Sequence, residues 1–221
     1  MVDKLSDPIG RLMGLRYKSH PWHGVFIGKD APKEVTAFIE VVSTDTVKYE
    51  IDKESGYLML DRPQKFSNVV PALYGFIPQT FCGDKVGEYT QKKTNRKNVK
   101  GDGDPIDICV LTEKTLAHGD LLVNALPIGG FRMIDGDQAD DKIIAVLQND
   151  TVYGHFKNID EVPSVVIQRL EHYFLTYKDM PGHDSNTEIA ATYGCEEAYQ
   201  VIKHSMEDYN VKFDNLGKLL S

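Results

Sequence analysis

The sequence has few cysteines, no long apolar run and no excess of basic side chains. Its three cysteines, Cys82, Cys109 and Cys195, are odd in number and widely spaced. That pattern argues against a disulfide framework or a zinc site and is typical of reduced thiols. The longest aliphatic run, 143–147, is too short to span a membrane, and residues 1–5 lack the apolar core of a signal peptide. We therefore expect a cytoplasmic protein.

Basic residues are outnumbered, with 25 lysines and arginines against 33 aspartates and glutamates, so that the net charge is −8. A negatively charged surface repels phosphate backbones and anionic lipids, which argues against nucleic acid or a membrane as the main partner. Apolar residues make up 41% of the 221 residues, as in ordinary globular proteins. One core is sufficient at this length, and we expect a single domain over 1–221.

Strand signals fill the middle of the chain and helix signals the last third. Glycine and proline punctuate residues 1–33, which we interpret as an irregular N-terminal arm. Strands are predicted at 34–42, 47–51, 57–60, 106–111, 121–126, 130–134 and 142–147. Apolar residues recur at helical spacing after Pro163 and again from Ala198 to Tyr209. Short strands followed by helices predict an α+β protein, mainly β, built on a small barrel or sandwich.

The segment 83–101 interrupts this order with basic residues and almost no aliphatic ones. Its basic side chains include Lys92, Lys93, Arg96, Lys97 and Lys100. We interpret it as an exposed basic loop, because charge runs of this kind are usually solvated.

The most informative motif is Gly-Asp-Gly-Asp-Pro-Ile-Asp at 101–107. Asp102 and Asp104 are two residues apart, so an extended backbone points both carboxylates the same way. Pro105 disfavours a helix at Asp104, and Asp107 follows at the start of an apolar strand. An EF-hand is a poor fit, because its third ligand position holds Ile106. Three carboxylates at the mouth of a buried strand indicate a site rather than a solvated turn.

A second acidic cluster spans 135–141 and includes Asp135, Asp140 and Asp141. Taken alone it is more typical of a solvated Asp-Gly turn. If the two clusters converge, their mutual repulsion requires cations, because two carboxylates about 4 Å apart repel by roughly 4 kcal/mol at an effective dielectric constant of 20. Oxygen ligands suit Mg²⁺, Mn²⁺ or Ca²⁺ better than zinc.

Basic and phenolic residues recur near the ends of the predicted elements. Lys48 and Arg62 lie on the two arms of a predicted hairpin, Lys142 begins a strand, and Lys178 follows a helix. Arginine binds phosphate through two parallel hydrogen bonds, whereas lysine acts as a point charge. Each residue alone has a structural alternative, such as an ion pair or a complement to the helix dipole. In combination with the acids they indicate a site for a multivalent anion.

These residues, in this order, resemble the first family of soluble inorganic pyrophosphatases, the magnesium-dependent type. The resemblance runs from about Phe38 to Lys178. It is carried by the segment 101–107, by Val-Lys-Tyr-Glu-Ile-Asp-Lys-Glu-Ser-Gly at 47–56, by Asp61-Arg62, by Tyr-Gly-Phe at 74–76, by the Asp135, Asp140 and Lys142 spacing, and by Tyr-Lys-Asp at 177–179. Val70 and Leu73 depart from it, because many relatives carry Tyr and Asn there.

The resemblance implies an OB-like five-stranded barrel with flanking C-terminal helices, in an enzyme that hydrolyses diphosphate to two orthophosphates with several Mg²⁺ ions. It also implies a homo-oligomer, either a dimer or a hexamer. Asp104 would be the catalytic base. The implied metal ligands are Glu40, Asp102, Asp107, Asp135 and Asp140, and the implied substrate ligands are Lys48, Arg62, Tyr74, Lys142, Tyr177 and Lys178.

Two other functions remain open from the residues alone. One is a hydrolase for a different phosphoanhydride, such as a nucleotide or polyphosphate, although no motif for a base or a chain is present. The other is a small-barrel module that binds single-stranded nucleic acid, which would need aromatic and basic residues interleaved on the strands. The carboxylates at the predicted strand ends argue against this module.

Overall fold

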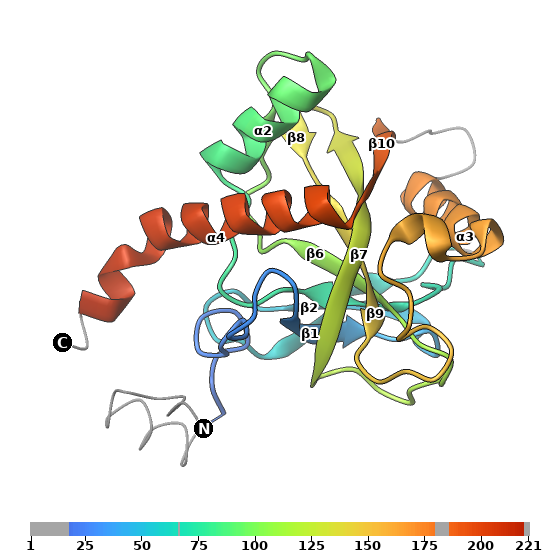
Figure 1. Cartoon of the computed structure of the whole chain (residues 1–221). Helices are drawn as coiled ribbons and strands as arrows, with labels where there is room; N and C mark the ends of the chain where they lie inside the picture. Colours follow the sequence, from blue (N-terminus) through green and yellow to red (C-terminus); the bar gives the residue numbers. More distant parts are fainter. Residues whose placement is uncertain (1–17, 66, 180–185, 219–221) are drawn as a thin grey trace.

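Five strands in the described part of the chain close into a small barrel, and the long β7 runs across the molecule in Figure 1. The computed structural model describes residues 18–65, 67–179 and 186–218. The ring consists, in spatial order, of β1 (Val35–Val41), β4 (Leu73–Phe76), β6 (Asp107–Leu111), β9 (Lys142–Leu147) and β7 (Leu121–Asp135). It closes because β7 pairs with β1 as well as with β9. The prediction of an α+β, mainly β fold with an OB-like barrel and flanking helices is confirmed.

Strand β7 is continuous over 15 residues, where the sequence predicted two separate strands. Pro127 and Gly129 lie in the gap between the two predicted strands. The register against β9 shifts between Pro127 and Gly129, and the strand continues through this irregularity. Bulges are positions at which a sheet tolerates proline and glycine. The predicted break between 126 and 130 is therefore wrong, because it marks a bend within one strand.

Three further strands extend the sheet beyond the ring, and none of them was predicted. They are β5 (Lys100–Gly101), β8 (Gln138–Ala139) and β10 (Thr187–Gly194). Strand β10 pairs antiparallel with the second half of β7. Only Tyr193 is buried in β10, so the strand lacks the apolar alternation that sequence reasoning needs. The short ring strand β4 was missed as well.

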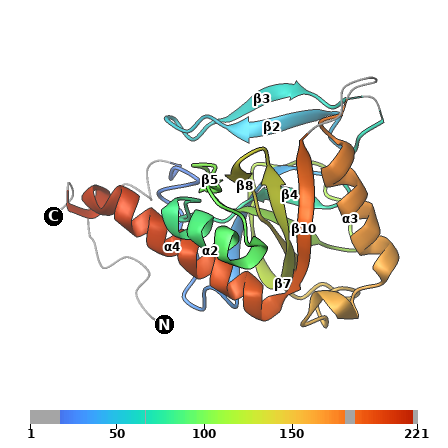
Figure 2. The ribbon, with the colours of Figure 1, turned by 90° about the horizontal axis from the view of Figure 1, so that it is seen from above.

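The hairpin of β2 (Val47–Ile51) and β3 (Leu58–Pro63) forms a separate two-stranded sheet. Figure 2 shows it beside the barrel, on the side where the short β5 and β8 end. Lys48 pairs with Arg62 across the ladder, as the predicted hairpin requires. Met59 and Leu60 on β3 are more than half exposed, and so is Tyr57 just before it.

The predicted loop at 83–101 is wrong over 84–94, where the chain forms the helix α2 (Asp84–Thr94). Its buried face is small and consists of Val86, Gly87 and Thr90. The backbone N–H groups at its start donate to the carboxylate of Asp208, more than 120 residues away in the chain. The composition of this segment did not predict a helix, because α2 buries only a narrow face and therefore contains few apolar residues. The basic side chains of the segment are exposed, as predicted.

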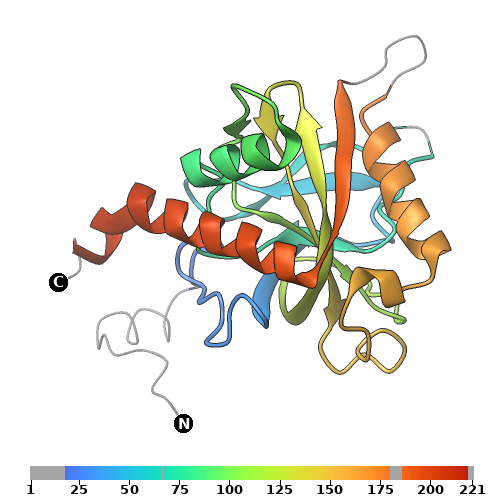
Figure 3. The same ribbon diagram turned by 45° about the horizontal axis from the view of Figure 1, so that its top comes forward.

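Helices cover the barrel on two sides (Figure 3). The 3₁₀ turn η1 (Ile159–Glu161) leads into α3 (Ser164–Thr176) on one side, and α4 (Cys195–Lys218) lies with α2 on the other. Both helices that the apolar spacing predicted are present. Residues 18–33 form turns without a helix or strand, whereas residues 1–17 of the predicted arm lie outside the described part. None of the described helices has the length and apolarity needed to cross a bilayer.

Three apolar clusters hold these layers together. The first joins the barrel to α2 and α4, and the second joins it to α3 through Phe131, Leu170 and Phe174. The third lies beneath the hairpin and consists of Trp22, Phe38, Ile51, Phe76 and Tyr209. Strands β1 and β4 approach closely where Ile39 pairs with Gly75. A Cβ atom at Gly75 would lie 1.9 Å from the carbonyl oxygen of Phe38, so only glycine permits this approach.

Candidate active site

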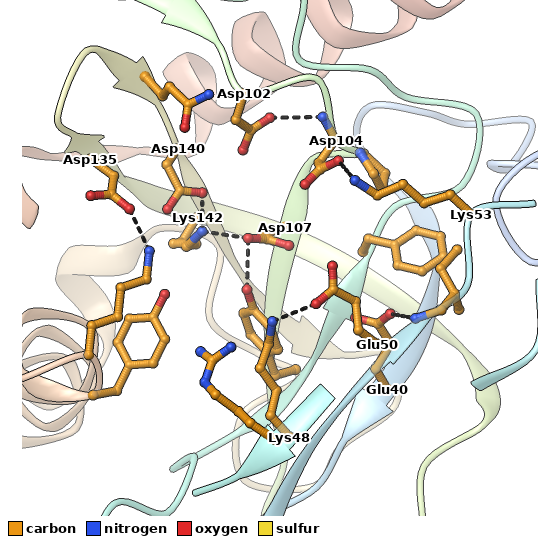
Figure 4. Close-up of a pocket in the computed structure, with 18 residues that line it drawn as sticks. Glu40, Lys48, Glu50, Lys53, Asp102, Asp104, Asp107, Asp135, Asp140 and Lys142 are labelled. Carbon is orange, nitrogen blue, oxygen red and sulfur yellow. Dashed lines mark hydrogen bonds and ion pairs between the residues drawn. The ribbon is translucent and has the colours of Figure 1, made fainter. Parts of the chain in front are cut away.

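A cleft of about 260 Å³ lies between the hairpin and the ends of β6, β7 and β9. Figure 4 shows charged side chains of both signs pointing into it. Its acidic lining residues are Glu40, Glu50, Asp102, Asp104, Asp107, Asp135 and Asp140, and its basic ones are Lys48, Lys53, Arg62, Lys142 and Lys178. Tyr74 and Tyr177 add phenolic groups, and Gln138 adds an amide.

The loop before β6 presents Asp102 and Asp104. The backbone N–H of Asp104 donates to Asp102 Oδ1 at 3.0 Å, which closes a local turn. Cys82 anchors the same loop, because its N–H donates to the carbonyl of Asp104 and its carbonyl accepts from Gly103. Burial and the neighbouring Asp140 raise the pKa of Asp102 to about 8. This carboxylate therefore lies where negative charge is already crowded.

Neighbouring strands bring together the middle of the cleft. Tyr74 on β4 donates its hydroxyl to Asp107 Oδ2 on β6 at 2.7 Å. Lys142 on β9 donates its ammonium to the same oxygen at 2.5 Å and also to Asp140 Oδ1. The Lys142 side chain is only 2% exposed. Although burial alone would lower the pKa of Lys142, the Asp107 and Asp140 carboxylates raise it well above its ordinary value. Lys142 is thus a fixed positive charge between two acids.

The end of β7 and the segment that follows α3 together form another part of the cleft wall. Lys178 donates to Asp135 Oδ2 at 2.5 Å, and this hydrogen bond is the main cause of the lowered pKa of Asp135. The carbonyl of Lys178 accepts from Lys65, which follows the hairpin. Tyr177 lines the same part of the cleft.

The hairpin supplies most of the cations on the opposite wall. Lys48 lies 2.9 Å from Glu50 and 3.3 Å from Asp61, and Arg62 pairs with Asp61 as well. Lys53, in the turn after β2, forms an ion pair with Asp104 across the cleft.

A buried carboxylate of β1 ties the hairpin to the barrel. Glu40 accepts a hydrogen bond from the backbone N–H of Ile51 at 2.8 Å. Burial raises the pKa of Glu40 to about 8. One of its two oxygens therefore has a structural partner in addition to any role in the cleft.

Acids outnumber bases in the cleft, seven to five. Burial raises the pKa of Asp140 too, so two of the neighbouring carboxylates, Asp102 and Asp140, hold their negative charge with difficulty. Within the described residues no three His, Cys, Asp or Glu side chains form a ready-made metal cage. Lysine ammonium groups instead stand between the acids. The set of hard oxygen donors and its excess negative charge fit divalent cations such as Mg²⁺, which would compete with the lysines for the same oxygens.

Sequence comparison places the chain among known proteins. The family model described as inorganic pyrophosphatase matches residues 37–210, a span that contains every charged residue of this cleft. The chain belongs to the inorganic pyrophosphatase family. It is 50% identical over 196 residues to the inorganic pyrophosphatase of Chlamydia trachomatis, covering 86% of this chain and 94% of that protein. It is 37% identical over 193 residues to the soluble inorganic pyrophosphatase of Oryza sativa, covering 86% and 79% of the two chains.

A structural comparison agrees. The crystal structure of the inorganic pyrophosphatase from Thermus thermophilus superimposes with a TM-score of 0.71 at 28% identity, covering 87% of this chain and 99% of the other. The inorganic pyrophosphatase from Neisseria gonorrhoeae gives a TM-score of 0.70 at 29% identity, covering 84% and 96%.

The inorganic pyrophosphatase fold brings all twelve sequence-predicted site residues to this single cleft. They are Glu40, Lys48, Arg62, Tyr74, Asp102, Asp104, Asp107, Asp135, Asp140, Lys142, Tyr177 and Lys178. Their individual roles stay predictions. The second acidic cluster divides: Asp135 and Asp140 face the cleft, Asp137 is exposed, and Asp141 is buried behind it.

Three polar lining residues, Glu50, Lys53 and Gln138, were not predicted. The alternation of β2 places Glu50 on the face of Lys48, and this signal could have found it. Lys53 lies in a turn and Gln138 on a two-residue strand, where no periodicity exists. Val70 and Leu73, which depart from the family pattern, are buried outside the cleft lining.

Proposed function

We propose that this protein hydrolyses inorganic pyrophosphate to two orthophosphates with Mg²⁺ in the cleft. The observation that carries the proposal is the gathering of seven acids, five bases and two tyrosines into one cleft of a chain that belongs to the inorganic pyrophosphatase family. A cleft that holds a strongly anionic substrate among carboxylates needs divalent cations between them.

The metal ligands we propose are Asp102, Asp107, Asp135 and Asp140, with Glu40 as a further ligand. Their oxygens are the donors that Mg²⁺ prefers, and the negative charge around Asp102 favours a cation. When bound, such ions supply charge neutralisation and a water molecule of lowered pKa. For the chain itself, metal binding requires Lys142 and Lys178 to share or release the oxygens that they hold here.

The substrate ligands come from opposite walls of the cleft. Lys48 and Arg62 extend from the hairpin, and Tyr177 and Lys178 extend from the segment after α3. Arg62 can bind one phosphoryl group through two parallel hydrogen bonds, whereas the lysines contribute point charges. Groups on opposite walls can hold the two phosphoryl groups of the substrate separately, which stabilises the leaving phosphate as its charge develops.

Asp104 is the group we propose as general base. It lines the cleft, and its side chain is 39% exposed, so water has access to it. The ion pair with Lys53 orients its carboxylate. A base in this position accepts a proton from the attacking water, a role that typically contributes 10²–10⁴-fold to the rate.

Phosphate release from pyrophosphate, measured with Mg²⁺ and with EDTA, tests the function. We expect release only with Mg²⁺. Asp104→Asn should lower kcat by about 10²–10⁴-fold while Mg²⁺ binding stays within about threefold of wild type. Asp160→Asn makes the same change at an exposed position on η1 and serves as the control. Absence of metal-dependent release by the wild type would refute the proposal, and near-normal turnover by Asp104→Asn would remove Asp104 from the role of base.

ATP and tripolyphosphate assayed in parallel define the substrate. Faster hydrolysis of either would favour a different phosphoanhydride. For a nucleic-acid module, binding of single-stranded DNA without metal would be required, and the acidic lining of the cleft opposes it.

We also propose a cytoplasmic homo-oligomer. The free thiols of Cys82, Cys109 and Cys195 fit a reducing compartment. The exposed side chains of Tyr57, Met59 and Leu60 fit a contact with another copy. Light scattering after size-exclusion chromatography measures the number of subunits, and a monomeric mass at working concentration would contradict the oligomer.

A further inference from the structure

A buried carboxylate lies directly behind the cleft, in the short connection between β8 and β9. Asp140 and Lys142 line the cleft, whereas Asp141 between them is buried and does not. The Asp141 side chain is 1% exposed. It does not line the cleft, and neither the substrate ligands nor the metal ligands proposed above include it.

Two partners hold Asp141 from behind. The hydroxyl of Tyr193 on β10 donates to Asp141 Oδ2 at 2.9 Å. The guanidinium of Arg132 on β7 lies 3.6 Å from the same oxygen, an ion pair longer than a hydrogen bond. The neighbouring strand leaves room for this arrangement, because a Cβ atom at Gly130 would lie 2.6 Å from the Tyr193 ring. The tyrosine ring therefore rests directly on the backbone of β7.

Arg132 is itself enclosed by the helices on this side of the barrel. Its side chain is 2% exposed, and its Nη1 lies 2.5 Å from Glu197 on α4. The rings of Tyr89 on α2 and Tyr193 lie 5.2 and 5.0 Å from the guanidinium carbon. Figure 3 shows α2, α4 and β10 together on this side of the molecule. The cluster thus joins three elements to the start of β9.

This cluster is a poor source of stability. Arg132 Nε and Nη2 and Asp141 Oδ1 have no hydrogen-bond partner among the described residues, although all are buried. A buried ion pair of this quality is often no more stabilising than apolar residues of the same size. What the cluster provides is a fixed position for Asp141, and through the backbone a fixed position for the residues on both sides of it.

Those two residues are central to the cleft. The backbone N–H of Asp140 donates to the carbonyl of Met133, and its carboxylate accepts from Lys142. A small rotation of the backbone at Asp141 would shift Asp140 and Lys142, and with them the contact of Lys142 with Asp107. We propose that Asp141, held by Tyr193 and Arg132, is a positioning residue that aligns Asp140 and Lys142 and thereby sets the affinity of the cleft for divalent cations. This inference rests on the proposed function, because it takes Asp140 as a metal ligand.

The test compares two tyrosines that each lose only a hydroxyl group. Tyr193→Phe removes the hydrogen bond to Asp141. Tyr209→Phe removes a hydrogen bond of 2.8 Å to His23, at a buried position of α4 that does not line the cleft. Mg²⁺ binding without substrate is measured by calorimetry on the full chain, together with kcat, KM and thermal stability. Loss of an outer partner of a metal site typically lowers metal affinity by 10–100-fold when the partner contacts a ligand directly. We expect about 3–10-fold for Tyr193→Phe, because it acts through one intervening residue.

Tyr209→Phe should bind Mg²⁺ within about twofold of wild type, even where its melting temperature falls as much as that of Tyr193→Phe. Asp141→Asn, which keeps an oxygen for Tyr193 but removes the charge facing Arg132, should weaken Mg²⁺ binding in the same direction. Equal Mg²⁺ affinity in wild type, Tyr193→Phe and Asp141→Asn would overturn the inference and leave the proposed function intact. A wild-type protein that binds no Mg²⁺ would overturn both.

Discussion

Lys142 offers the sharpest test of how the cleft balances its charges. Its ammonium is buried between Asp107 and Asp140, and the replacement Lys142→Met keeps most of the side-chain length while it removes the charge. Removing one partner of a buried ion pair typically destabilises a protein by about 3–5 kcal/mol. We expect the lower end, about 3 kcal/mol, because burial already raises the pKa of Asp140 and this carboxylate can take up a proton. For a chain of this length the loss corresponds to a decrease of about 6–12 °C in the melting temperature.

Divalent cations should reverse much of this loss. Without the ammonium, Asp107 and Asp140 are both available to a cation, and a ligand at 100 times its Kd stabilises the folded state by about 2.7 kcal/mol. Denaturation of wild type and Lys142→Met in EDTA and in excess Mg²⁺ measures the effect. We expect Mg²⁺ to stabilise Lys142→Met more than it stabilises wild type.

Lys178→Met is the matched control, because it removes the same group from a half-exposed pair with Asp135. Such pairs contribute about 0–1 kcal/mol. Equal losses for the two variants in EDTA would refute the role of Lys142 as a buried counter-charge. Equal stabilisation of wild type and Lys142→Met by Mg²⁺ would refute the placement of metal at Asp107 and Asp140.

Two further predictions concern the barrel and the N-terminal arm. Gly75→Ala places a Cβ atom 1.9 Å from Phe38 O between two paired strands, so we expect a loss of about 4 kcal/mol or more in denaturant unfolding; a soluble variant within about 1 kcal/mol of wild type would show that β1 and β4 can separate. Burial, assisted by His20, lowers the pKa of His23 from 6.5 to about 4. At this residue the unfolded chain binds more protons between these values, so His23 contributes a decrease in the unfolding free energy as pH falls from 6.5 to 4. Because this histidine is half-exposed, we expect His23→Gln to reduce that decrease by about 1–2 kcal/mol. An unchanged pH dependence of the unfolding free energy in His23→Gln would contradict a lowered pKa for His23.

Much of the cleft was predictable because its residues lie at the ends of strands with clear patterns. The alternation of 47–51 predicted Lys48 on the face opposite the apolar one. Pro105 predicted an extended backbone just before β6. The family resemblance supplied what spacing could not, namely that Asp135 and Asp140 face the same cleft as Asp102. From the residues alone the second acidic cluster was more typical of a solvated turn, and Asp137 does behave in that way.

The missed elements depend on partners that are distant in the chain. Helix α2 has a buried face of Val86, Gly87 and Thr90 and is capped by Asp208, so its stability comes from α4 rather than from its own composition. Strand β10 is a strand because β7 pairs with it, although most of its side chains are exposed. Lys53 enters the cleft from a turn, where its direction is set by Asp104.

The two walls of the cleft are attached to the molecule in different ways. Asp107 and Asp135 lie on β6 and β7 of the closed ring, so neither can move far without breaking backbone hydrogen bonds of the sheet. The hairpin with Lys48 and Arg62 shares no ladder with that ring in the part of the chain that the structure describes. Its bonds to the barrel include the side-chain contact from Glu40 to Ile51, and beneath it lies one apolar cluster. The hairpin is therefore the wall that can move to open the cleft for substrate entry and product release, while the carboxylates on the ring strands stay in place.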